Sequence, residues 1–564
     1  MFRIADKLIS KISPSRLDPM GLGQTYWNFW RSVMKNPGKL MTQNIQLANE
    51  QLNLLAYGVK KVAGQEVEAV IAPEKGDRRF KNAAWSEQVI FDMIKQSYLL
   101  TSSYMMSVAG SSDLDKKQQH KLEFFTRQMV DALSPANFAL SNPEVLKATA
   151  ESKGENLVRG MKNLVSDLVD GKGQLKISMV DKSQFEIGKN IATTPGKVVY
   201  ENELMQLIQY TPTTDKVFKR PLVIYPPWIN KFYILDLSPK NSFIRWAVSQ
   251  GYTVFVVSWI NPDERLSHKT FEDYMNEGVF TALDAIEDAT GEREVNAIGY
   301  CIGGTLLACA LSQMAITGDT RIHSATFFTT QVDFSEAGDL MIFIDEDQLE
   351  SLEKKMGKAG YLDASDMATS FNMLRSNDLI WTFVINNYLL GRSPAAFDLL
   401  YWNNDSTRMS YAMHSFYLRE MYLKNKLVEP GAISFNGIPV VLSEIKIPVF
   451  LQSSREDHIA PYPSVYKATH HYSGLVTFMM AGSGHIAGVI NSPEMNKYYY
   501  YTNPEVPEDV ADWIEQAQHH EGSWWPYWHQ WLYRKSGSKV AARIPGDGAL
   551  EVIEDAPGRY VKMK

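Results

Sequence analysis

The fold is decided by residues 294–304, which read E-V-N-A-I-G-Y-C-I-G-G. The apolar run 294–300 is typical of a buried strand, and the apolar pattern that follows it, 305–317, is typical of a helix. Between them, G-Y-C-I-G matches the nucleophile-elbow pattern G-x-S-x-G, with cysteine in place of serine. Glycine is needed at both ends of such a turn because neighbouring backbones approach closely there. The stretch therefore predicts a strand, a sharp turn with Cys301 at its tip, and a helix.

Runs on both sides of this stretch also have the apolar character of short strands: 221–225, 252–259, 324–330, 447–453 and 475–480. Helical patterns fall among them at 242–250, 271–288 and 305–317. Strands that alternate with helices predict a mainly parallel sheet with right-handed crossovers. In such a sheet the ligand site lies at the carboxyl ends of the strands.

The alternation is interrupted once, by residues 333–446, far beyond the usual connection of ~2–6 residues. Their helical and aromatic character predicts an inserted cap over the mouth of the site. Residues 1–180 have mostly helical patterns, and the aromatic run 523–532 is expected in a core or an interface. The predicted architecture is an α/β-hydrolase fold. It has a helical N-terminal domain (1–180), a core in two parts (181–332 and 447–564) and a cap or lid (333–446).

Composition excludes several classes of function. The 564 residues carry 57 Lys and Arg against 64 Asp and Glu, and a net charge of −7 argues against a general nucleic-acid binder. The cysteines, Cys301 and Cys309, form no disulfide framework, no metal-ligand pattern stands out, and a reducing cytosol is expected. The sequence has no apolar stretch long enough to predict a membrane-spanning helix. Residues 1–20 form a basic amphipathic pattern that either packs on the protein or docks on an apolar or anionic surface.

A cysteine nucleophile needs a base, and the base needs an orienting acid. In this fold the chain order is nucleophile, acid, histidine. The strand at 447–453 leads to Asp457, and the strand at 475–480 leads to His485, so both side chains are expected at the sheet edge that carries Cys301. Glu456 is an alternative acid, and His458 either fixes the acid loop or contacts substrate. The alternative for Cys301 itself is an inert buried cysteine, which is our interpretation of Cys309 in its apolar run.

The oxyanion hole is expected to combine two backbone N–H groups. One belongs to Ile302, directly after the nucleophile. The other comes from the loop after the first strand, where Pro226 and Pro227 have no N–H, which leaves Trp228 or Ile229. Cysteine in place of serine also bears on the reaction, because an enzyme thioester keeps an acyl group activated. Exchange with an incoming thioester is nearly isoenergetic, which favours an acyltransferase over a hydrolase.

Several further motifs resemble the polyhydroxyalkanoate synthases, from about residue 220 to the C-terminus. The matching runs, besides G-Y-C-I-G-G, are Y-P-P-W-I-N-K-F-Y-I-L-D-L-S (225–238), V-S-W-I-N-P (257–262), N-D-L-I-W (377–381), L-Y-W-N (400–403), G-S-G-H-I-A-G-V-I-N-S-P (482–493) and A-P-G-R-Y-V-K (556–562). The resemblance implies polymerisation of (R)-3-hydroxyacyl-CoA into a polyester, with CoA as the leaving group and no cofactor. The family's nucleophile, base and acid map on Cys301, His485 and Asp457. In the family the acid is thought to help deprotonate the acceptor's 3-hydroxyl.

The resemblance also implies partners and location. Length and single-chain organisation are similar to the class I synthases, which favour short-chain monomers such as 3-hydroxybutyryl-CoA. Such enzymes act as homodimers at polyester granules in the cytoplasm, in contact with the granule surface and granule-associated proteins. His458 and Trp402, the latter in the L-Y-W-N run, are the substrate-contact candidates, while Trp228 departs from the smaller residue of many relatives. The alternatives are a cysteine-dependent ester or lactone hydrolase of the same fold, and a catalytically inactive granule-binding module.

Overall fold

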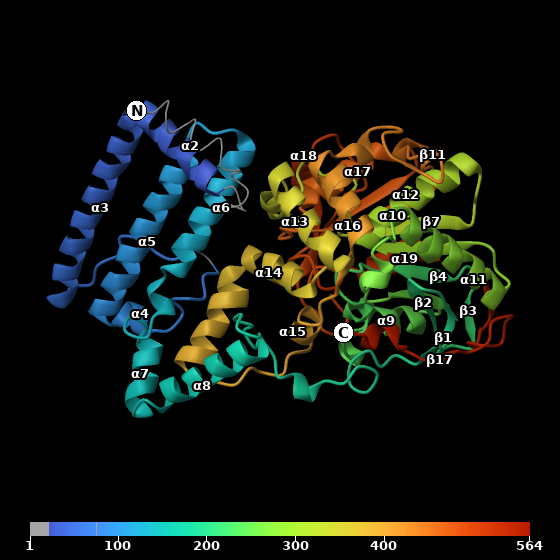
Figure 1. The fold of residues 1–564 in the computed structure, drawn as a ribbon, viewed down its shortest axis with the longest axis horizontal. Helices are drawn as coiled ribbons and strands as arrows, with labels where there is room; N and C mark the ends of the chain where they lie inside the picture. The colour runs from blue at the N-terminus through green and yellow to red at the C-terminus, as the bar shows by residue number, and fades with distance from the viewer. Residues whose placement is uncertain (1–21, 75) are drawn as a thin grey trace. The chain divides into compact units, whose positions relative to one another are not determined.

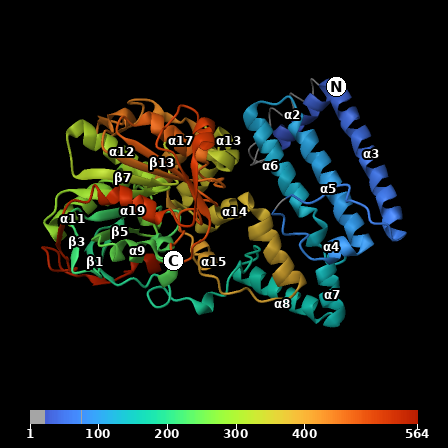
Figure 2. The same ribbon diagram turned by 180° about the vertical axis from the view of Figure 1, so that it is seen from behind.

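The computed structural model describes residues 22–74 and 76–564, so the predicted amphipathic segment 1–20 lies outside the described residues. The chain divides into two compact units, which Figures 1 and 2 show from opposite sides. Unit 1 comprises Met1–Asp181 and Thr369–Ala396, and unit 2 comprises Lys182–Ala368 and Phe397–Lys564. Within the described residues, no helix is both long enough and apolar enough to cross a membrane.

Unit 2 is built on a sheet with the order β15-β14-β13-β12-β7-β6-β4-β5-β2-β1-β17 among the described residues. Its centre, from β13 to β5, is parallel throughout. These central strands are the predicted ones, and the predicted mainly parallel sheet is confirmed. Their bounds are β4 Leu222–Tyr225, β5 Val254–Trp259, β6 Val295–Tyr300, β7 Ile322–Phe328, β12 Val449–Ser454 and β13 Val476–Ala481.

The sheet continues at both edges with antiparallel strands that the sequence analysis did not predict. They are β1 Gly196–Glu201, β2 Met205–Tyr210, β14 Tyr499–Thr502, β15 Gln518–Glu521 and β17 Glu554–Asp555. Strand β2 reads M-Q-L-I-Q-Y and is buried along its whole length. Its Gln206 amide donates to the side chains of Glu201 (2.7 Å) and Glu554 (2.5 Å). A buried strand with paired polar residues has neither the alternation nor the apolar run by which strands are predicted.

Helices cover both faces of the sheet and give unit 2 two apolar cores. On one face lie α11 (Thr281–Thr290), α12 (Ile302–Thr317) and α17 (Tyr462–His471). On the other lie α9 (Phe243–Ser249) and α19 (Trp525–Tyr533), with Trp524, Trp525 and Trp528 fully buried. The predicted helices are therefore present, and the aromatic run 523–532 belongs to a core.

Unit 1 is helical. Up to residue 181, its described α-helices are α2 Leu22–Lys35, α3 Pro37–Val62, α4 Ala84–Glu87, α5 Val89–Gly110, α6 Lys116–Ala132, α7 Pro143–Glu151 and α8 Glu155–Asp170. Side chains cap several of them: Asp115 accepts from the N–H of Gln118 at the start of α6, and Asn142 accepts from two N–H groups at the start of α7. Pro143 at the first position of α7 has the backbone angle that a helix start needs.

The segment 333–446, predicted as one cap, is divided between the two units. Residues 369–396, with the π-helix η10 (Val384–Leu389), lie in unit 1 against α8. The contact is polar: Asn156 and Asn163 of α8 donate to backbone carbonyls of 387–389 at 2.8–2.9 Å. A Cβ added at Gly160 would overlap the carbonyl of Tyr388, so glycine permits this approach. Contacts of this kind join residues far apart in sequence and leave no local pattern.

The rest of the inserted segment stays with unit 2. It includes α13 (Glu346–Ala359), α15 (Asp398–Asn403), α16 (Tyr411–Phe416) and the π-helix η11 (Tyr417–Leu423). Buried residues of α13, α16 and η11 join the same core as α12, the helix that follows the elbow. These three helices therefore pack on the face of the sheet that α12 covers, whereas Trp402 of α15 belongs to the core on the other face.

Candidate active site

Cys301 lies between β6 and α12, at the sharp turn that the sequence predicts. Its backbone has φ 53° and ψ −125°, a conformation rare outside glycine and characteristic of a nucleophile elbow. The turn fits because Gly303 has no side chain: a Cβ there would overlap the carbonyl oxygens of Tyr225 and Pro226. The N–H of Cys301 donates to the carbonyl of Phe328 at 2.9 Å, which ties the tip of the turn to β7.

Asp457 and His485 meet at the same sheet edge. Strands β12 and β13 pair in parallel, with Ser454 opposite Ala481, so the loops that follow them leave the sheet side by side. The Nδ1 atom of His485 lies 2.7 Å from Oδ2 of Asp457, and both side chains are buried. The other carboxylate oxygen, Oδ1, accepts from the N–H groups of Ile459 and Ala460, each at 2.9 Å. The acid is therefore held in place from two sides.

His485 also interacts with Cys301. Burial of the ring disfavours its protonated form, but the charges of Asp457 and Cys301 and hydrogen bonds to both raise the pKa of His485 from 6.5 to about 10. Tyr300 fixes the backbone at this point, because its hydroxyl donates to the carbonyl of His485 at 3.2 Å. A protonated ring places positive charge beside the sulfur, and the thiolate is the nucleophilic form of cysteine.

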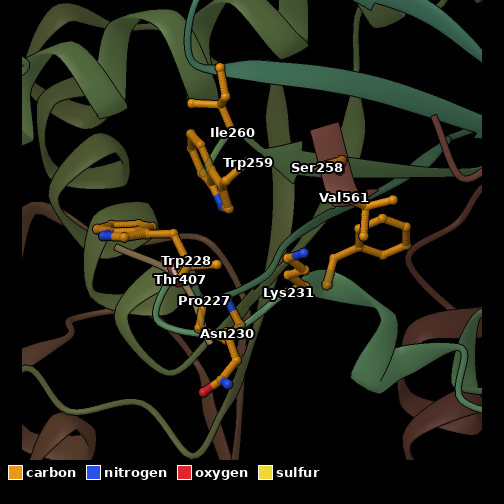
Figure 3. A pocket seen from close by; sticks show the side chains of 10 residues that line it. Pro227, Trp228, Asn230, Lys231, Ser258, Trp259, Ile260, Thr407 and Val561 are labelled. Carbon is orange, nitrogen blue, oxygen red and sulfur yellow. Dashed lines mark hydrogen bonds between the residues drawn. The ribbon is translucent and has the colours of Figure 1, made fainter. Parts of the chain in front are cut away.

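The loop after β4 lies beside the elbow because β4 pairs with β6, with Tyr225 opposite Gly299. Trp228 is buried, and its ring packs on Trp259 and Tyr274 with centroids 5.3 and 4.8 Å apart. The indole of Trp259 donates to the carbonyl of Pro226 at 2.9 Å, and the hydroxyl of Thr407 donates to the carbonyl of Ile229 at 2.7 Å. Residues of the loop line a small pocket, shown in Figure 3, whose lining also includes Trp259 and Thr407. These contacts fix the loop backbone.

The two predicted oxyanion donors, Ile302 and Trp228, lie at the sheet edge that carries Cys301. Ile302 is the first residue of α12, a position whose backbone N–H has no carbonyl one turn earlier in the helix to bind. Trp228 lies on the fixed loop at the same edge. Their role as donors stays a prediction, with Ile229 the alternative to Trp228.

The remaining candidate residues, His458, Trp402 and Cys309, differ in how deeply they are buried. His458 directly follows the acid and is half-buried. Trp402 is 4% exposed, and its indole N–H donates to the carbonyl of Lys231 at 2.7 Å. The structure therefore places Trp402 in the core of unit 2, and its contact with substrate stays a prediction. Cys309 is fully buried in α12, and burial raises the pKa of its thiol far above the ordinary value.

Two residues near the nucleophile were missed by the sequence analysis. Tyr417 and Tyr422 of η11 are buried, their rings lie 5.3 Å apart, and the Tyr422 hydroxyl lies 3.4 Å from Oε1 of Gln331. Burial, with a further contribution from the charge of Cys301, raises the pKa of both hydroxyls well above the usual value, so they stay protonated donors. No motif marks them, because they belong to the insert and reach the site only through its packing.

Comparisons with known proteins show to which family the chain belongs. Residues 76–247 match the family model described as "Poly-beta-hydroxybutyrate polymerase (PhaC) N-terminus", and residues 228–491 match "alpha/beta hydrolase fold". A poly(3-hydroxyalkanoate) polymerase of Methylorubrum extorquens is 51% identical over 533 residues, covering 94% of this chain and 88% of that protein. The chain belongs to the poly(3-hydroxyalkanoate) polymerase family. As a member of that family it is an acyltransferase with an α/β-hydrolase core.

Other members of the polymerase family are similar over comparable lengths. The polymerase subunit PhaC of Rhizobium meliloti is 48% identical, covering 96% of this chain and 87% of the relative. The corresponding subunit of Cupriavidus necator is 42% identical, covering 86% of this chain and 83% of the relative. The similarity therefore extends over both units.

Proposed function

We propose that this polymerase-family chain joins (R)-3-hydroxyacyl-CoA units into a polyester and releases CoA, through an acyl thioester on Cys301. The observation that carries the proposal is the position of His485, which hydrogen-bonds to Asp457 at 2.7 Å and also interacts with Cys301. An activated thiol at an elbow suits acyl transfer from one thioester to another. The printed names of the relatives, poly(3-hydroxyalkanoate) polymerases, support the same product class.

In the first step the thiolate of Cys301 attacks the carbonyl carbon of the acyl-CoA. The negative charge that develops on the carbonyl oxygen is received by the N–H groups of Ile302 and Trp228. The bond from carbon to the CoA sulfur then breaks, and the leaving thiolate takes a proton from His485. The products are an acyl thioester on Cys301 and free CoA, and the energy of the thioester is conserved.

In the second step the 3-hydroxyl oxygen of another acyl unit attacks the Cys301 thioester. Its proton passes to His485, with Asp457 stabilising the imidazolium or acting on the hydroxyl more directly. An oxygen ester forms, the bond to the Cys301 sulfur breaks, and the thiolate is regenerated. No cofactor enters this scheme, since CoA serves only as the leaving group.

We further propose the monomer class and surroundings of the enzyme. The class I resemblance favours short-chain monomers such as 3-hydroxybutyryl-CoA, a homodimer, and work at polyester granules in the cytoplasm, among granule-associated proteins. Helix α8 supports granule contact. Its polar face packs inside unit 1, whereas its apolar residues are exposed: Leu157, Val158, Met161, Val165, Leu168 and Val169. An exposed apolar face of this kind suits an apolar surface such as the polyester.

The alternative is a cysteine-dependent ester or lactone hydrolase, favoured by the match of residues 228–491 to the hydrolase fold. The deciding experiment incubates the full chain with (R)-3-hydroxybutyryl-CoA, measures released CoA, and weighs insoluble polyester. We expect CoA release in proportion to polymer, its loss in Cys301→Ala, and near-normal rates in Cys309→Ala. Release of CoA with only free 3-hydroxybutyrate as product would establish the hydrolase instead.

A further inference from the structure

Helix α3 (Pro37–Val62) of unit 1 has two apolar faces, and only one of them is covered. Leu54 and Tyr57 are buried against α5, together with the partly buried Leu47. On the opposite face, six large apolar side chains are between 53% and 74% exposed: Met41, Ile45, Leu52, Leu55, Val59 and Val62. Figures 1 and 2 show α3 at the edge of the helices of unit 1, with α5 beside it. A helix that is apolar on both faces is normally buried on both.

The exposed residues follow the spacing of a coiled-coil seam. With Ala48 they form the series 41, 45, 48, 52, 55, 59, 62, in which steps of four and three alternate without a break. This 3.5-residue repeat over three heptads is the pattern that packs against another helix. We call these seven residues the α3 seam. A flat apolar surface requires no such repeat, only a broad apolar arc.

The charges of α3 also favour a helix as the partner. The charged residues, Lys39, Glu50, Lys60 and Lys61, all lie outside the seam. The positions that flank the seam carry the uncharged residues Thr42, Asn44, Asn49 and Gln51. Two identical seams can therefore pack together without like-charge repulsion. An anionic surface is disfavoured as the partner, because no row of positively charged residues lies beside the seam.

From this arrangement we infer that the α3 seam binds the α3 seam of a second copy of this chain, so that α3 pairs across a two-fold axis. The inference rests on the proposed homodimer and names its surface. Pairing of the two seams, with their flanking residues, buries on the order of 1,000 Å² of accessible surface in total, near the lower limit for a specific interface. We therefore expect a dimer that dissociates on dilution.

The test compares two double variants of the full chain by sedimentation velocity over a range of concentrations. Leu52→Glu/Leu55→Glu places two charges in the seam, and Gln46→Glu/Asn53→Glu places two charges at exposed positions of α3 outside it. We expect the seam variant to dissociate at concentrations at least about tenfold higher than wild type, with unchanged helix content, and the control to match wild type. A seam variant that dimerises like wild type would overturn the inference while leaving the homodimer intact. A wild-type protein that is monomeric would refute both the α3 pairing and the proposed homodimer.

Cross-linking gives an independent readout that does not depend on charge. Single cysteines at Ile45, Leu52 and Val59 are oxidised in the full chain, with Asn53→Cys as the exposed control. We expect at least one seam cysteine to form disulfide-linked dimers in excess of the control, and none to do so when the chain is dilute. No excess at any seam position contradicts the pairing. Loss of granule binding by the glutamate variant with an unchanged dimer would assign the seam to the polyester surface and also refute the inference.

Discussion

Replacing Asp457 with asparagine removes one negative charge beside His485 and keeps the shape of the side chain. Burial disfavours the imidazolium, yet Asp457 and Cys301 raise the pKa of His485 from 6.5 to about 10. That rise corresponds to roughly 5 kcal/mol of stabilisation of the protonated ring, to which the charge of Asp457 makes the largest favourable contribution. An asparagine amide loses this charge and no longer favours the tautomer with a proton on Nδ1.

The two half-reactions differ in how much they need that charge. A thiol has a pKa of ~8.5 and needs only a base nearby, whereas the 3-hydroxyl of an acceptor is a far weaker acid. We expect Asp457→Asn to acylate Cys301 and release one equivalent of CoA, and then to elongate on the order of 10³–10⁴-fold more slowly. His485→Gln should lose both phases.

The assay is rapid-quench measurement of CoA release, with mass detection of acylated Cys301 in the same samples. Glu456→Gln is the matched control, because this neighbouring carboxylate is exposed and should leave both phases intact. If Asp457→Asn abolished the first acylation as completely as His485→Gln, Asp457 would only orient the base. If Glu456→Gln reproduced the slow elongation, the acid would be misassigned.

Three further expectations concern the elbow and its surroundings. Gly303→Ala should destroy activity, because its Cβ would overlap the carbonyl of Tyr225. Gly357→Ala in α13 is the control, since a Cβ there meets no atom within 4 Å, and it should keep activity and raise the unfolding free energy by about 0.5–1 kcal/mol. Equal activity of the two variants would refute the close approach. Cys309→Ala should keep its turnover and lose about 1–2 kcal/mol of stability in urea unfolding, and an inactive but folded variant would give Cys309 a chemical role. The pKa of His485 is raised in the folded state, so its contribution to the free energy of unfolding is complete below pH 6.5 and is lost as the pH rises to about 10. Urea unfolding across this pH range should show that wild type loses stability relative to His485→Gln. Parallel stability curves of the two proteins would contradict the raised pKa.

The central sheet and the elbow could be predicted because each is encoded locally. An apolar strand, two glycines around Cys301 and an apolar helix are consecutive in the chain, so the pattern itself specifies the turn. Asp457 and His485 could be placed because loops after parallel strands share one sheet edge. The motifs that resemble the polymerase family then pointed to the same three residues.

The features that could not be predicted depend on contacts between distant segments. Buried Gln206 concealed strand β2, since its amide is satisfied by carboxylates that only the fold brings near. The polar contact of α8 with residues 387–389 divides an insert that looks continuous in sequence. Tyr417 and Tyr422 reach the site through packing of the insert. None of these leaves a periodic signal in the sequence. Apart from Glu201, which lies on the strand next to β2, the partner residues are hundreds of positions away or belong to an irregular segment.

The claim on which the account depends is that Cys301 carries the acyl group. The direct measurement is mass spectrometry of the intact chain and of its Cys301 peptide, quenched in acid within the first turnover with (R)-3-hydroxybutyryl-CoA. The account predicts a thioester-linked 3-hydroxybutyryl group on Cys301, released by neutral hydroxylamine, formed with one equivalent of CoA and missing from Cys301→Ala. CoA release at full rate with no acyl group on Cys301 at any time, or an acyl group on another residue, would contradict it.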